Sequence, residues 1–255
     1  VGAAANANAS ALLRGARGNS GVILSLLFRG LSKALKGRET ADAAAFAAAM
    51  QEGVSAAYKA VMKPAEGTIL TVSRLAAARA ADAARATPND PEAVLEAAIA
   101  EGQLALENTI NQNPVLKKAG VVDAGGKGFL VILQGMLDSM RGLPLPEESG
   151  DHAKPEQKTD YAAIAAEEIT FTFDTVFIVR KTTRKSLEAF QAYLNSIGDS
   201  LVIGEDDDAF KVHVHTDIPG AALTEAQKYG TLELAKIENM RTQAEDLAAG
   251  RHIQS

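Results

Sequence analysis

The apolar residues of this chain change their spacing once, and this change divides the sequence into two structural classes. Over residues 1–142 they recur three and four positions apart, which is the period of an amphipathic helix. From residue 169 they alternate, as in a strand with one buried face. The stretch between begins LPLPEESGDHAKPEQKTD and carries prolines and charges without a period. We therefore predict a helical domain at 1–142, a linker at 143–168 and an α+β domain at 169–255.

The helical region contains enough residues that typically begin or end helices to place its individual helices. Asp90 is suited to cap a helix, and Pro91 fits the first helical position, where its missing N–H costs nothing. The predicted helix ends are Gly37, Lys63-Pro64, Thr87-Pro88 and Asn113-Pro114. The pattern predicts six helices, at residues 3–15, 19–36, 40–62, 67–86, 90–112 and 123–141.

The alternating region predicts four strands and two helices. The strands are expected at 169–181, 200–205, 210–216 and 232–237, and the helices at 186–197, with Ser186 as its cap, and at 219–229. The order β-α-β-β-α-β is that of a ferredoxin-like sandwich. The acidic run at 205–208 lacks the spacing and glycine of a calcium loop, so we predict a hairpin turn there.

Composition excludes several functional classes. A formal net charge of -6 argues against a nucleic-acid partner, which would require a basic face. We expect a cytoplasmic protein, because no apolar run reaches the roughly 18 residues of a membrane span and no secretion signal is visible. The absence of cysteine excludes disulfides and thiolate ligands. Because Val1 already lies in a helical pattern, we interpret the sequence as truncated.

Two glycine-rich segments of the helical region are candidate phosphate-binding loops. GARGNSG at 15–21 leads into an apolar helix, whose first N–H groups and positive dipole end suit an anion. GVVDAGGKG at 120–128 places Asp123 at a helix start, followed by residues that permit close approach. The alternatives are a helix–helix turn with Ser20 as N-cap, and Asp123 as a simple cap. A third segment, PAEGTILT at 64–71, places Thr68 where it is most simply a cap.

The α+β region holds a pair of histidines with ligand spacing. His213 and His215 are two residues apart on a predicted strand, so both side chains lie on one face of the sheet. Such a pair can chelate a metal if a third ligand comes from a neighbouring strand, and it is otherwise structural or exposed. Asp217 is a possible fourth ligand, although a turn-capping role fits it better.

These segments together resemble a known kinase family. ARGNSGVILS, PAEGTILTVSR and GVVDAGGKGF are similar to the DhaL-type domain of dihydroxyacetone kinases and, more closely, of bacterial fatty acid kinase A. The resemblance implies an all-α eight-helix barrel that binds ATP at one end, of which about six helices fall in this sequence. GDSLVI, KVHVHTDIPG and KIENM resemble the middle domain of the same family.

The resemblance also implies which residues form the sites. It assigns the phosphate-binding loop to Gly18, Asn19, Ser20 and Gly21, the segment near the adenine to Thr68 and Ile69, and a later nucleotide contact to Asp123 and Gly125. In the middle domain the family has a zinc-type site formed by two histidines and a cysteine. The cysteine position corresponds best to Asp174, so a metal is expected at Asp174, His213 and His215, with an affinity altered by the harder carboxylate.

One element of the family pattern is missing. The family carries an Asp-rich loop, P-D-G-D-T-G, whose carboxylates hold two magnesium ions, and this sequence starts after it. We therefore expect no appreciable kinase activity from this chain alone, because phosphoryl transfer depends on metal neutralisation of charge.

The implied reaction is ATP-dependent phosphorylation of a fatty acid carboxylate, giving an acyl phosphate. The implied partner is a fatty-acid-binding protein of DegV type, and a homodimer is expected. The alternatives are a non-catalytic dimerisation or assembly module and a dihydroxyacetone kinase-type protein.

Overall fold

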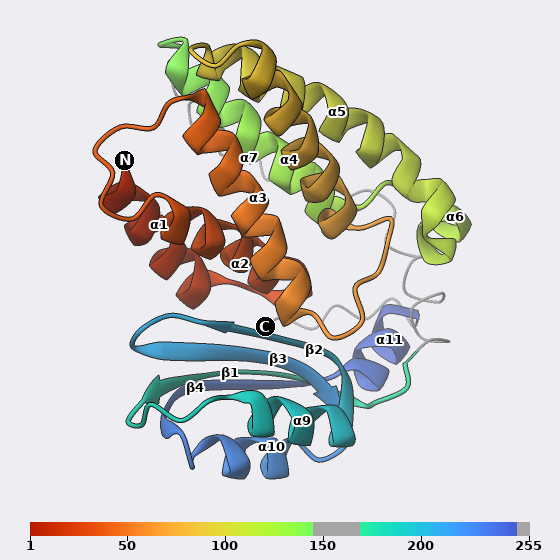
Figure 1. Ribbon diagram of the computed structural model, residues 1–255. Helices are drawn as coiled ribbons and strands as arrows, with labels where there is room; N and C mark the ends of the chain where they lie inside the picture. The colour runs from red at the N-terminus through yellow and green to blue at the C-terminus, as the bar shows by residue number, and fades with distance from the viewer. Residues whose placement is uncertain (145–168, 249–255) are drawn as a thin grey trace. The chain divides into compact units, whose positions relative to one another are not determined.

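A computed structural model describes residues 1–144 and 169–248 of the chain (Figure 1). By secondary structure we call residues 1–144 the helical unit and residues 169–248 the second unit. Most of the predicted linker, residues 145–168, and the chain end from 249 lie outside the described residues. The helical unit contains α1 (Gly2–Gly15), α2 (Gly18–Ala34), α3 (Ala43–Ala60), α4 (Ile69–Ala86), α5 (Pro91–Gln112), α6 (Pro114–Ala119) and α7 (Ala124–Met140). The order confirms the predicted fold class, a helical part followed by an α+β part.

The helix count was wrong by one, and the cause is a proline. Asn113-Pro114, which we predicted as a helix end, also begins α6. Asn113 follows the last residue of α5 and, through its side chain, accepts the N–H of Val115 at 3.0 Å to cap α6. Pro114 fits because a proline at the first helical position loses no hydrogen bond. The predicted Asp90 cap is confirmed, since its carboxylate accepts the N–H of Ala93 at 2.9 Å.

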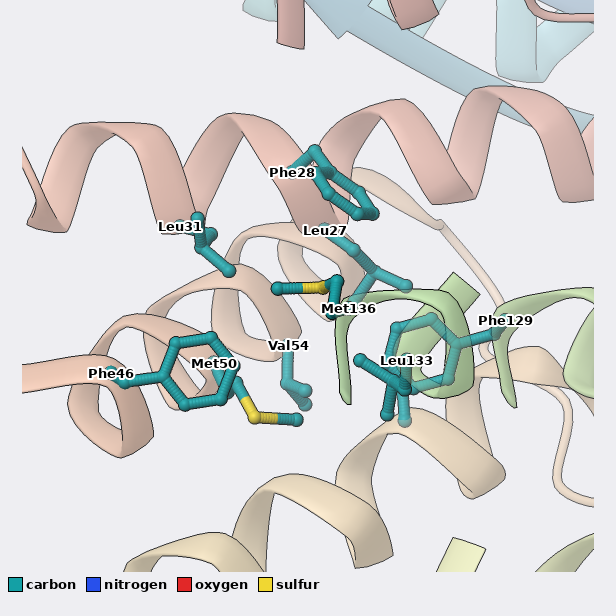
Figure 2. A pocket seen from close by; sticks show the side chains of 10 residues that line it. Leu27, Phe28, Leu31, Phe46, Met50, Val54, Phe129, Leu133 and Met136 are labelled. Carbon is teal, nitrogen blue, oxygen red and sulfur yellow. The ribbon is translucent and has the colours of Figure 1, made fainter. Parts of the chain in front are cut away.

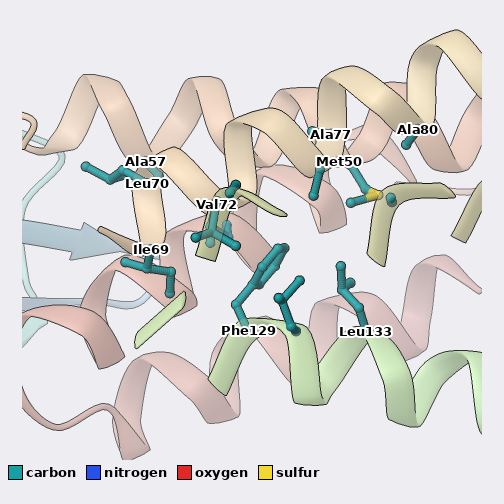
Figure 3. Packing of buried hydrophobic residues seen from close by; sticks show 14 of the residues in the cluster. Met50, Ala57, Ile69, Leu70, Val72, Ala77, Ala80, Phe129 and Leu133 are labelled. Carbon is teal, nitrogen blue, oxygen red and sulfur yellow. The ribbon is translucent and has the colours of Figure 1, made fainter. Parts of the chain in front are cut away.

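The core of the helical unit centres on α4, which packs against α3, α5 and α7. Figure 3 shows its apolar face meeting Met50 and Ala57 of α3 and Phe129 and Leu133 of α7. Alanines occupy the later turns of this face, and they let the helix axes approach closely because they carry a single carbon. The buried residues of α4 in this core are Ile69, Leu70, Val72, Ala76, Ala77, Ala80 and Ala84.

Helices α2 and α3 touch through a pair of glycines. A Cβ added to Gly30 would lie 2.6 Å from the Cα of Gly53, and a Cβ added to Gly53 would overlap the carbonyl oxygen of Leu27. Both contacts involve backbone atoms, which cannot rotate away as a side chain can. The separation of these two helices is therefore set by the absence of side chains at Gly30 and Gly53.

The second unit has the predicted β-α-β-β-α-β order. It contains β1 (Phe173–Lys181), α9 (Glu188–Ile197), β2 (Gly198–Glu205), β3 (Ala209–Thr216), α10 (Pro219–Ala226) and β4 (Gly230–Asn239), followed by α11 (Met240–Ala248), which the sequence analysis missed. The strand order is β2-β3-β1-β4, so β3 lies between β2 and β1. Strand β4 pairs antiparallel with β1, with Asp174 opposite Glu238.

Helices α9 and α10 lie on one face of this sheet (Figure 1). Phe177 of β1 meets Phe190 of α9 with ring centroids 6.4 Å apart, and Phe190 meets Tyr229 at 5.2 Å. Because side chains alternate along a strand, Asp174 of β1 points to the opposite face from Phe177. The sheet therefore separates an aromatic core under the helices from the face that carries Asp174.

Candidate functional site

The N-termini of three helices meet at one end of the helical unit. A Cβ on Gly125, in the first turn of α7, would lie 2.8 Å from the Oγ of Ser20 in the first turn of α2. The carboxylate of Asp123, which precedes α7, accepts the backbone N–H of Ile69 at the start of α4. Helix N-termini carry partial positive charge, so this end of the unit favours an anion. The structure thus brings together the three segments that the sequence analysis singled out separately.

Helix α2 begins without a side-chain cap. Arg17 is its extended N-cap residue and makes no capping hydrogen bond, whereas every described helix from α3 to α7 has one. The alternative prediction of Ser20 as N-cap was wrong, because α2 starts at Gly18, whose φ of 61° is the left-handed conformation that glycine adopts readily. The first-turn N–H groups of α2 are therefore left without a side-chain acceptor in the described part of the chain.

Asn19 adds a second unsatisfied group to this helix start. Its Oδ1 is buried and has no hydrogen-bond partner among the described residues. A buried polar atom without a partner is unfavourable, and such groups mark places where a ligand, an ion or a water completes the structure. Gly21, the last residue of the predicted loop, has no room for a side chain without pressing on Ala16 at 3.3 Å.

Thr68 is a cap, as its simplest interpretation predicted. Its Oγ1 accepts the N–H of Leu70 at 3.3 Å and donates to the carbonyl of Ala65 at 2.8 Å. Ile69 is 2% exposed, so its side chain belongs to the core and only its N–H faces Asp123. Neither residue has a polar side-chain group left over for an adenine.

A side-chain network that the sequence analysis missed holds the turn before α4. Glu66 accepts hydrogen bonds from the hydroxyl of Thr71 at 2.7 Å, from Arg74 at 2.8 Å and from the hydroxyl of Tyr58 at 3.2 Å. Burial acts to raise the pKa of Glu66, but the bonds from Thr71 and Arg74 outweigh it and lower the pKa. The only signal in the sequence was that Thr71 and Arg74, which follow Glu66, are three residues apart and so lie on the same face of a helix.

Asp123 caps α7 and ties it to α4. Its Oδ2 accepts the N–H of Gly126 at 2.7 Å, and its own N–H donates to the Oγ1 of Thr109 at 3.1 Å. Burial raises the pKa of Asp123 above its ordinary value, and the N–H groups of Gly126 and Ile69 offset part of that rise. The predicted capping role is confirmed, and its carboxylate is already engaged with backbone donors.

A separate apolar pocket lies between the helices and is no candidate for phosphate. Its cavity volume is only about 20 Å³, and it is lined by nine apolar side chains and Ser73. Figure 2 shows these side chains converging. Without a charged side chain or a free N–H in its lining, it offers no partner for an anion.

The predicted metal ligands do come together in the second unit. One atom each from Asp174, His213 and His215 lies within 4.8 Å of the others, and no other such group of His, Cys, Asp or Glu occurs in residues 1–144 and 169–248. Nε2 of His213 is 2.9 Å from Oδ1 of Asp174. Ligand atoms of a tetrahedral ion with bonds of about 2.1 Å lie roughly 3.4 Å apart, so small shifts complete the geometry.

The electrostatics of this cluster suit a cation. Burial acts to raise the pKa of Asp174, but its contact with His213 and the charges of both histidines lower it below the ordinary value. Burial, followed by the neighbouring His213, lowers the pKa of His215, which favours the neutral imidazole that a metal binds. The Oδ1 of Asp174 is buried and has no hydrogen bond of acceptable geometry within the described part of the chain. The donor set fits a divalent metal.

Two neighbouring acidic groups are not part of this cluster. Asp217 lies outside it and accepts the N–H of Thr172 at 2.7 Å, which lowers its pKa. Because Thr172 lies 45 residues earlier in the chain, this bond joins two distant segments and does not confirm the predicted turn-capping role. In the acidic run, the Oδ1 of Asp206 accepts the N–H groups of Asp208 and Ala209 at 2.9 and 2.8 Å. That pattern belongs to a hairpin turn, as predicted.

Comparison with known proteins places both units. The model of the DAK2 domain matches residues 1–138, and that of the fatty acid kinase A-like middle domain matches residues 170–247. The protein YloV of Bacillus subtilis (strain 168) is 44% identical over 256 residues, covering 95% of this chain and 45% of the relative.

An uncharacterized protein of Staphylococcus saprophyticus is 42% identical over 248 residues, covering 94% of this chain and 45% of its own length. One from Staphylococcus aureus (strain USA300) is 41% identical over 239 residues, covering 91% and 43%. The chain thus spans less than half the length of these relatives. Among the described helices, none is both long and apolar enough to cross a membrane.

Proposed function

Because the chain belongs to the family of DAK2-domain proteins with a fatty acid kinase A-like middle domain, we propose that it is part of an ATP-dependent kinase acting on a fatty acid. The product would be an acyl phosphate, and the fatty acid would be held by a separate binding protein of DegV type. The observation that carries the nucleotide-binding part is the uncapped start of α2, which lies against the starts of α4 and α7.

The helical unit would bind ATP through backbone groups. The N–H groups of Gly18, Asn19, Ser20 and Gly21 would take the phosphates, because no side chain caps this helix start. Gly125 would let the α7 turn approach those phosphates. Asp123 would act by holding the starts of α4 and α7 together, since its carboxylate is occupied by N–H groups. Thr68 and Ile69 would lie on the adenine side through their backbone alone, because the Ile69 side chain is buried in the core.

The described helical residues offer no cluster of side chains that could hold magnesium by itself. No group of three acidic or histidine side chains close enough to hold an ion occurs in residues 1–144. We therefore propose that this 255-residue chain binds ATP but does not transfer its phosphate, because the charge that develops in transfer would not be neutralised. Turnover of radiolabelled ATP by the isolated chain would contradict this.

We predict that Asn19→Asp weakens ATP binding at least roughly tenfold. The substitution places a negative charge at the start of α2, where phosphate oxygens would otherwise lie, and repulsion replaces a polar contact. Calorimetric titration of the chain with ATP measures the change. Adenosine, which has no phosphates, should bind both forms equally, and Asn111→Asp on the exposed face of α5 should leave ATP affinity unchanged. If Asn19→Asp and the unaltered chain bind ATP equally well, the start of α2 does not bind the phosphates.

The substrate class requires a longer protein. A chimaera in which this chain replaces the matching segment of the Bacillus subtilis relative can be assayed beside the unaltered relative. With ATP and a fatty-acid-loaded binding protein, hydroxylamine should trap an acyl hydroxamate. Formation of dihydroxyacetone phosphate instead would favour the dihydroxyacetone kinase alternative. A chain that binds no ATP at all would favour the assembly module, which could form a homodimer.

In the middle domain we propose a zinc-type ion at Asp174, His213 and His215. Three protein ligands on β1 and β3 would hold it, and it would supply a cross-link between two neighbouring strands.

A further inference from the structure

In both histidines of the middle domain, the ring nitrogen Nδ1 faces an oxygen atom of β2. Nδ1 of His213 lies 3.4 Å from the carbonyl oxygen of Ser200, and Nδ1 of His215 lies 3.4 Å from Oδ1 of Asp199. Both oxygens come from consecutive residues at the start of β2. In a neutral imidazole one nitrogen carries the proton and the other a lone pair. An oxygen facing Nδ1 favours the proton there and leaves Nε2 to bind an ion.

With its proton on Nδ1, His213 makes a contact with Asp174 that is favourable only if a cation lies between the two atoms. If the proton of His213 is on Nδ1, its Nε2 lone pair faces the Oδ1 of Asp174 at 2.9 Å, and two acceptors repel each other. That Oδ1 has no hydrogen bond of acceptable geometry among the described residues. A cation between the two atoms would turn the repulsion into two coordinate bonds.

The backbone at the start of β2 is distorted where these oxygens arise. Ser200 has a φ of 54°, and it is the only described residue other than glycine with a positive φ. Serine avoids this conformation, so surrounding structure must hold it there. The distorted residue, Ser200, is the one whose carbonyl faces His213. It directly follows Asp199, whose carboxylate faces His215.

We propose that Asp199, together with the carbonyl of Ser200, forms an outer layer of the metal site that fixes both imidazoles with Nε2 toward the ion. Asp199 is a positioning residue for His215 and not a ligand, since it lies outside the group of atoms close enough to share an ion. Its Oδ1 is buried and makes no hydrogen bond of acceptable geometry among the residues described, although it lies 3.4 Å from Nδ1 of His215, so a small shift would let it accept the Nδ1 proton. The inference rests on the proposed metal ion at Asp174, His213 and His215.

The test is zinc affinity of the full 255-residue chain and its variants, measured by competition with a chromophoric chelator. Asp199→Ala should weaken zinc binding by about 10- to 100-fold, the range for loss of an outer-layer partner. Asp199→Asn, which keeps an oxygen acceptor but loses the charge, should fall between Asp199→Ala and the unaltered chain. Glu238→Gln, opposite Asp174 on β4, removes a nearby charge without touching either histidine, and should change affinity less than about threefold.

Cobalt substitution separates positioning from ligation. The visible absorption bands of the cobalt-loaded chain depend on the atoms bound to the metal. Asp199→Asn should leave those bands in place, whereas Asp174→Asn should shift or abolish them. Bands that shift as much in Asp199→Asn as in Asp174→Asn would make Asp199 a ligand and overturn the proposal. Unaltered zinc affinity in Asp199→Ala would also overturn it, whereas failure of the unsubstituted chain to bind zinc or cobalt would instead remove the underlying metal site.

Discussion

Alanine at position 53 is expected to lower the free energy of unfolding of the helical unit by about 1–3 kcal/mol, the usual cost of overpacking. The new Cβ would overlap the carbonyl oxygen of Leu27, and α2 and α3 would have to separate. Alanine has the higher helix propensity by about 1 kcal/mol, so propensity alone predicts the opposite sign. Valine at the same position should cost more. Urea unfolding followed by far-UV circular dichroism measures the difference.

Gly135→Ala is the matched control. Gly135 lies within α7, and a Cβ there would meet nothing within 4 Å. With no clash, only the propensity gain remains, and the helical unit should become more stable by about 0.5–1 kcal/mol. If Gly53→Ala stabilises the unit as Gly135→Ala does, the added Cβ is accommodated without cost. The close contact of α2 and α3 then does not require glycine at position 53.

The second large effect concerns the metal. The unaltered chain should bind one zinc ion, and zinc at about one hundred times its dissociation constant should stabilise the middle domain by about 2.7 kcal/mol. Asp174→Asn should abolish that stabilisation, because a neutral amide is a poor zinc ligand of nearly the same shape. Elemental analysis and thermal unfolding with and without zinc measure both quantities.

Asp217→Asn provides the control for general loss of negative charge. Asp217 is near in sequence to both histidines but accepts the N–H of Thr172 and lies outside the ligand group. The Asp217→Asn variant should bind zinc with the affinity of the unaltered chain. If Asp217→Asn loses zinc binding and Asp174→Asn keeps it, Asp217 rather than Asp174 is the ligand. If both variants keep zinc binding, Asp174 is not a ligand.

Much of the fold was predictable because its signals are local. Asp90 and Thr68 were identified as caps from residue type and position, and both form the expected hydrogen bonds. The βαββαβ order followed from the change of hydrophobic period. The same local reasoning failed at Asn113-Pro114, since proline ends one helix and begins another equally well, and only the capping bond of Asn113 distinguishes the cases.

The sites were less predictable because they depend on contacts distant in sequence. The loops at Ser20 and Gly125 were each weak candidates, and only folding brings them within contact. The resemblance supplied Asp174, which spacing alone would not have paired with His213. Asp199 was missed because a carboxylate that contacts a histidine distant in sequence leaves no trace in the local pattern. Glu66 was missed because its one local signal, the spacing of Thr71 and Arg74, is common on any helix.

The position of β3 between β2 and β1 has a consequence for the order of folding. Strands β2 and β3 are joined by the short Asp206–Asp208 turn, so their hairpin closes a small loop, whereas β3 meets β1 only after α9 and β2 are spanned. Loop closure is slower for distant segments, so the hairpin should form early and then dock against β1 and β4. Side-chain truncations at Val212 and Val214 should then mainly slow refolding, and truncations on β4 should mainly accelerate unfolding, as stopped-flow kinetics can measure.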